Sequence, residues 1–153
     1  MEETRRLAAF VAGTRFEDLP AEVVEQARLY ALDNLAGGLV GALQPWCRAV
    51  AAMAREQGGR PACSLFATPW RTSPSWAALV NGVAVGGFEL DHPFGPGSAH
   101  PGATVFPALL ALAEARPCDG RTFLTAMALG YEGLCRIGLA ATRVVEDVRG
   151  FHG

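Results

Sequence analysis

Residues 20–41 read PAEVVEQARLYALDNLAGGLVG, and this stretch decides the kind of fold that the chain adopts. Pro20 suits the first turn of a helix, because the N–H that proline lacks would be unpaired at that position in any case. Apolar residues then recur at the spacing of one helix face: Val23, Val24, Ala27, Tyr30, Ala31, Leu35 and Leu39. The stretch therefore predicts a long helix with one buried face.

Three glycines, Gly37, Gly38 and Gly41, lie at the far end of this predicted helix. Each weakens it, since glycine costs up to about 1 kcal/mol relative to alanine in a helix interior. We expect a close contact with another helix to compensate for this cost.

The rest of the chain also has helical spacing. Residues 62–67 are the one plausible short strand, and the loop at residues 92–101 is rich in proline, glycine and histidine. The further helices are expected before Gly13, at residues 46–57, from Ser73 to near Phe88, at residues 105–115 and at residues 122–141. The predicted fold class is all-α, in a chain whose 153 residues match the size of one domain.

Composition excludes some classes of partner. The formal net charge is -2 and none of the 13 basic residues is lysine, so we expect no nucleic acid partner. No uninterrupted apolar segment of the export or membrane-spanning type is present, so we expect no membrane association and a cytoplasmic location. The four cysteines lack a C-x-x-C pair, which favours reduced thiols over a disulfide framework or a metal site.

Chemistry is concentrated in residues 89–100. Glu89 and Asp91 follow a predicted helix and enter a loop that contains His92 and His100. Carboxylates and imidazoles are the commonest general acids and bases, which makes this loop a candidate active site. The alternative is that both acids are solvated at a helix end while His100 caps a turn. Residue types alone do not decide between the two.

Longer strings of sequence resemble the MmgE/PrpD family, which includes 2-methylcitrate dehydratases, cis-aconitate decarboxylases and iminodisuccinate epimerases. The resemblance covers nearly the whole chain. Its strings, in family order, are residues 7–11, 19–24, 32–37, 81–84, 87–91, 100–108, 130–132 and 136–138.

The resemblance implies four catalytic residues. Glu89 and Asp91 match the family's acidic-x-acidic pair, and His100 matches the histidine of its His-Pro motif. His152, in the string Arg149-Gly150-Phe151-His152-Gly153, matches a second active-site histidine. The implied chemistry is proton abstraction next to a carboxylate of a small di- or tricarboxylate, 2-methylcitrate dehydratase-like, with His100 or His152 as acid/base and no cofactor.

Two departures from the family pattern leave alternatives open. Gly86 stands where many members have a histidine, and His92-Pro93 follows the second acid where many have another acid. The loop therefore binds a different substrate or has lost activity. The rival interpretation is a non-catalytic remnant that serves assembly or regulation with a partner chain.

The resemblance also implies that residues 1–153 are part of a larger helical domain whose lid domain is absent. A natural subunit, a split enzyme and a truncation all fit this expectation. Family members are commonly homodimers, so we expect a homo-oligomer or a second chain that supplies the lid domain and the family's lysines. An unrelated all-helical binding domain would require the matching strings to be coincidental.

Overall fold

The computed structural model describes residues 2–142 and 148–149 of the chain. It is built from helices, with one two-stranded antiparallel sheet among the described residues. The α-helices are α1 (Glu2–Gly13), α2 (Ala21–Gly41), α3 (Pro45–Gln57), α4 (Pro74–Gly86), α5 (Pro101–Ala115) and α6 (Gly120–Thr142). Short 3₁₀ turns are η1 (Phe16–Asp18) and η2 (Gly95–Gly97). The all-α prediction is confirmed.

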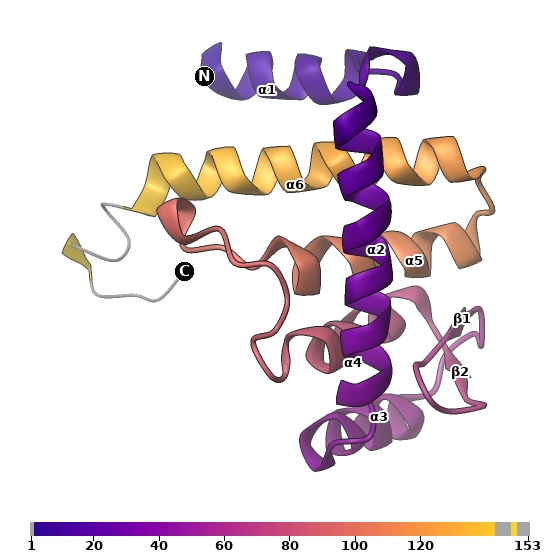
Figure 1. The fold of residues 1–153 in the computed structure, drawn as a ribbon. Coiled ribbons are helices and arrows are strands. Elements are labelled where there is room, and N and C mark those ends of the chain that lie inside the picture. Colours follow the sequence, from indigo (N-terminus) through magenta and orange to yellow (C-terminus); the bar gives the residue numbers. More distant parts are fainter. Residues whose placement is uncertain (1, 143–147, 150–153) are drawn as a thin grey trace.

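Helix α2 crosses α6, α5 and α4 in turn, as Figure 1 shows. Helices α5 and α6 run antiparallel, and α3 lies with the small sheet at the far end of α2. The predicted helix of residues 20–41 is thus the element that ties the others together. In the part of the chain that the structure describes, no helix is long and apolar enough to span a membrane.

Close approach of α2 to α4 explains two of the three glycines in α2. A β-carbon on Gly41 would lie 1.8 Å from the carbonyl oxygen of Ala84, and one on Gly38 would lie 2.6 Å from the Phe66 ring. The expected compensating contact is therefore present at these two positions. At Gly37 a β-carbon would meet nothing within 4 Å.

The predicted bounds of some strands and helices differ from those in the structure. Strand β1 covers only Cys63–Ser64 and pairs with β2 (Arg71–Thr72), which the sequence pattern did not predict. Helix α4 ends at Gly86, and α5 begins at Pro101, four residues earlier than expected. Proline at the first helical position already has the backbone angle of a helix. The helix therefore starts directly after His100, at residues that the sequence had assigned to the loop.

Two buried clusters form the core. One joins α3, α4 and the sheet, with Cys47, Ala54, Cys63 and Val80 at its centre. The other joins α4, α5 and α6 through Val85, Phe106 and Met127, with Tyr30 of α2 and Tyr131 of α6 packed against it. This second cluster supports the loop between α4 and α5, where the candidate site lies.

Candidate active site

Asp91 is buried in the loop between α4 and α5, with its side chain only 1 % exposed. Its Oδ2 atom accepts a hydrogen bond from the backbone N–H of Ala103 at 3.0 Å. Ala103 is the third residue of α5, so the carboxylate satisfies an N–H that the helix itself leaves unpaired. The positive end of the α5 dipole also favours a negative charge at this place.

The other oxygen of Asp91 contacts His100. The distance from His100 Nδ1 to Asp91 Oδ1 is 3.2 Å. Because the carboxylate can only accept, this contact favours the tautomer of neutral His100 that carries its proton on Nδ1. The Nε2 atom then has a lone pair, and the side chain is 32 % exposed. The pair is therefore arranged as a base whose ring is held by a carboxylate and remains reachable.

Glu89 is placed differently. It is exposed, its backbone is left-handed with φ of 53°, and its N–H donates to the carbonyl of Gly86. Among the described residues, no hydrogen bond or ion pair joins its side chain to Asp91 or His100. The structure thus brings together two of the predicted site residues and leaves Glu89 on the surface beside them.

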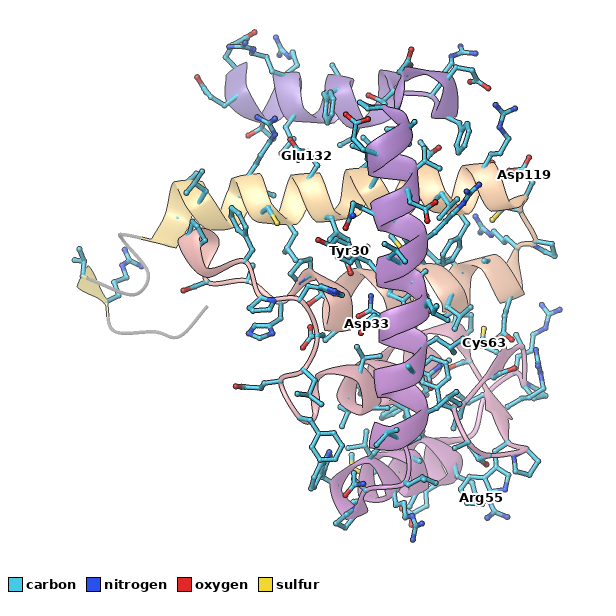
Figure 2. The ribbon with its side chains drawn as sticks, in the orientation of Figure 1. Tyr30, Asp33, Arg55, Cys63, Asp119 and Glu132 are labelled. Carbon is cyan, nitrogen blue, oxygen red and sulfur yellow. The ribbon has the colours of Figure 1, made fainter. Side chains whose placement is uncertain are left out.

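His92, in the same loop as Asp91, contacts two side chains of α2. Its ring lies 3.9 Å from that of Tyr30 between centroids, and its Nε2 is 3.7 Å from Asp33 Oδ2. Figure 2 shows Tyr30 and Asp33 on the side of α2 that faces the α4–α5 loop. His92 therefore helps to dock this loop on α2.

Gly86 packs against the first turn of α5. A β-carbon there would lie 3.0 Å from the β-carbon of Ala103. A histidine, as expected at this place in many family members, would need α4 and α5 to move slightly apart. The fourth predicted residue, His152, lies outside the described residues.

A hollow of about 270 Å³ opens beside Asp91, between α2 and the loop. Asp33, Asn34 and Asp91 supply its polar wall, and Val85, Phe88 and Leu90 are among its apolar lining residues. Among the residues at 2–142 and 148–149, no group of three or more histidine, cysteine, aspartate or glutamate side chains is placed to hold a metal ion.

Sequence reasoning missed two polar residues behind Asp91. Asn34 on α2 is 1 % exposed, and its Nδ2 is 2.9 Å from the hydroxyl oxygen of Tyr131 on α6. Two signals were available: residues 34 and 131 both fall within family-like strings, and residue 34 is a polar residue among apolar ones, on the side where Tyr30 and Ala31 lie. Nothing local connects residues 34 and 131.

The MmgE/PrpD N-terminal domain matches residues 5–152. The chain belongs to the MmgE/PrpD family. The match agrees with the resemblance of the individual strings and covers both predicted catalytic strings, around Asp91–His100 and around His152.

Curated proteins also match over most of this chain. The cis-aconitate decarboxylase-like protein oryM of Aspergillus oryzae is 31 % identical over 97 % of the chain and 32 % of its own length. The cis-aconitate decarboxylase of Aspergillus terreus is 29 % identical over 90 % of the chain and 29 % of its own length. The human cis-aconitate decarboxylase is 28 % identical over 97 % of the chain and 32 % of its own length. The chain thus spans about a third of the length of these relatives.

Proposed function

We propose that this chain supplies the acid/base part of the active site of an MmgE/PrpD-type lyase or isomerase that acts on a small di- or tricarboxylate. The observation that carries the proposal is the contact between His100 and the buried carboxylate of Asp91. A carboxylate that holds Nδ1 orients the imidazole and fixes its tautomer. His100 is then the acid/base, and Asp91 is the residue that positions it.

The proposed reaction is decarboxylation, because the curated relatives named above are cis-aconitate decarboxylases or similar proteins. The C–C bond to one carboxylate breaks, carbon dioxide leaves, and the electron pair stays on carbon. The His100 imidazolium gives its Nε2 proton to that carbon or to a carbon conjugated with it. In a 2-methylcitrate dehydratase-like reaction or an epimerisation, neutral His100 would instead remove a proton next to a carboxylate.

The hollow beside Asp91 is suited in size to a small organic acid, but its charge is wrong for a polycarboxylate. Asp33 and Asp91 both line it, and the chain contains no lysine. Like charges at close range disfavour substrate binding, so cationic groups must come from elsewhere. We propose that the two-thirds of the relatives' length beyond the match corresponds to the part that supplies these groups.

Glu89 and His152 complete the proposed catalytic set by their match to the family's motifs. Glu89 stands two residues before Asp91 and is exposed, so its carboxylate is free to meet a substrate or another part of the enzyme. His152 is the second candidate acid/base. Two imidazoles would allow proton removal and proton delivery on different faces of the substrate.

The test measures turnover by the full-length protein that contains residues 1–153. With cis-aconitate, we expect carbon dioxide release, and in His100→Ala we expect kcat/KM to fall by about 10²–10⁴-fold. His92→Ala is the comparison variant, since His92 lies in the same loop but contacts Tyr30 and Asp33, so an equal loss in His92→Ala would show that docking of the loop carries the effect. Full turnover by His100→Ala would overturn the proposal.

Exposed apolar side chains on and just after α2 favour a second candidate function, an assembly or regulatory module. Leu32 is 65 % exposed, Val40 56 % and Leu43 54 %. Such a surface is typical of one that meets a partner. This alternative predicts a stable complex with a partner chain and no turnover of cis-aconitate or 2-methylcitrate. Turnover that depends on His100 would exclude it.

A further inference from the structure

Asn34 and Tyr131 form a polar contact inside the second core cluster, directly behind the Asp91–His100 pair. Residues 34 and 131 lie on α2 and α6, and Asn34 is 1 % exposed. A buried amide of this kind needs partners at both of its ends, because an unpaired buried polar atom destabilises the folded chain. Nδ2 of Asn34 is 2.9 Å from the Tyr131 hydroxyl oxygen.

The other end of the amide, Oδ1, is buried without a hydrogen-bond partner. It borders Gly102, the second residue of α5. A β-carbon on Gly102 would lie 2.4 Å from Asn34 Oδ1 and 3.2 Å from Asp91 Oδ2. Both oxygens therefore surround one small volume, and two acceptors face the same place.

Tyr131 can take either role in its contact with Asn34. Burial raises its pKa to about 12, and the negative charge of Asp91 acts in the same direction. Its hydroxyl therefore keeps its proton at neutral pH, so it can accept from Asn34 or donate to it. As placed, the hydroxyl accepts from Asn34 Nδ2, whereas Asn34 Oδ1 has no donor and borders the same volume as Asp91 Oδ2.

A half-turn of the Asn34 amide would give a hydrogen-bond partner to both its oxygen and its nitrogen. The turn needs little space, because the two atoms have nearly the same shape. Oδ1 would accept the Tyr131 proton, and Nδ2 would point toward Asp91. We infer that Asn34 is a positioning residue for the Asp91–His100 pair, with its amide anchored by Tyr131 and its NH₂ group donating to the Asp91 carboxylate. The role in catalysis rests on the proposed function, whereas the hydrogen-bond arrangement does not.

This arrangement gives the Asp91 carboxylate donors on three sides: the Ala103 N–H, the His100 Nδ1 and the Asn34 NH₂. Donors on three sides fix the position of the carboxylate. A fixed Asp91 carboxylate holds the imidazole in the tautomer whose Nε2 can act as a base. Asn34 thus influences the reaction through Asp91 without touching the substrate.

Asn81 is the matched control. It is also 1 % exposed, and it lies on α4 in the other core cluster. Its Oδ1 accepts from the Phe66 N–H and its Nδ2 donates to the Ser64 carbonyl, both at 3.0 Å. Both ends of its amide are thus paired with backbone groups, and neither of these partners belongs to the Asp91–His100 pair. We therefore expect its role to be structural.

The first measurement is NMR on the isotope-labelled chain. We expect nuclear Overhauser effects from the Asn34 NH₂ protons to the Gly102 and Ala103 backbone protons to be stronger than those to the Tyr131 ring. We also expect Asp91→Asn to shift these NH₂ resonances more than Tyr131→Phe does. Stronger effects to the Tyr131 ring, or a larger shift in Tyr131→Phe, would overturn the inference. The first comparison uses the unchanged chain and so does not depend on how a variant folds.

The second measurement is kinetic and uses the complete enzyme. In Asn34→Leu we expect kcat to fall by roughly tenfold or more with KM little changed, as expected when one hydrogen bond to a charged group is lost. Asn81→Leu should lower stability without this split between kcat and KM. Wild-type kcat in a folded Asn34→Leu enzyme would refute the positioning role. If no substrate is turned over, the proposed function fails while the NMR result still decides the hydrogen-bond arrangement.

Discussion

Helices α5 and α6 each have an aspartate that accepts the N–H of the helix's third residue, yet the two aspartates differ in their place in the chain and in their burial. Asp119 stands directly before α6, is exposed, and accepts from Thr122 at 2.7 Å. Asp91 comes from twelve residues before Ala103, is buried, and accepts at 3.0 Å. The first is a local cap, and the second reaches α5 from the preceding loop.

The comparison shows that burial of the carboxylate is not needed to cap a helix. Hydrogen bonds from Thr122 lower the pKa of Asp119. The hydrogen bond from the Thr122 N–H to this exposed carboxylate is a sufficient cap for the start of α6. A cap does not require a buried carboxylate, and burial of a charge is costly unless it is paired. Asp91 is buried where it can also hold His100, which favours a functional reason for its position over a purely structural one.

Asp91→Asn should break the comparison most strongly. The amide keeps the shape and can still accept from Ala103, but it cannot fix the tautomer of the His100 ring. We expect kcat/KM of the complete enzyme to fall by about 10²–10⁴-fold with the fold retained, measured by substrate turnover and circular dichroism. Asp119→Asn is the control and should keep wild-type activity. Equal activity in the two variants would contradict the special role of Asp91.

Gly102→Ala tests how tightly the start of α5 is packed. The new β-carbon would lie 2.4 Å from Asn34 Oδ1 and 3.0 Å from Asp91 Cβ. We expect the free energy of unfolding to fall by about 1–3 kcal/mol, measured by urea denaturation. Gly120→Ala at the start of α6 is the control, because its β-carbon would meet nothing within 4 Å. A Gly102→Ala chain as stable as Gly120→Ala would show that α5 is not packed in this way.

Asp119→Ala should have the smallest effect, and that effect should depend on pH. The pKa of Asp119 is lowered from 3.8 in the folded chain, so its contribution to stability is present above 3.8 and is lost as pH falls through the lower folded value. The melting temperature of Asp119→Ala should therefore lie slightly below that of the wild type at neutral pH and approach it in acid. A gap that widens in acid would reverse the assigned sign.

Much of the fold could be predicted because it follows from local periodicity. The apolar face of residues 20–41 and its glycines anticipated α2 and its close contact with α4 at Gly38 and Gly41. The pairing of β1 with β2 was missed, since two-residue strands have too little pattern to recognise. The start of α5 was also missed, because the prolines and glycines around His100 resemble a loop.

The candidate site divides in the same way. The sequence by itself determined the residue types, Glu89, Asp91, His100 and His152, because their order and spacing match the strings of the MmgE/PrpD family. Only the tertiary structure decided that Asp91 joins His100 to the start of α5, that Glu89 stays on the surface, and that Asn34 and Tyr131 lie behind the pair. The physical reason is that a helix depends on residues three and four apart, whereas these hydrogen bonds join α2 to α6 across 97 residues and the α4–α5 loop to α5 across 12.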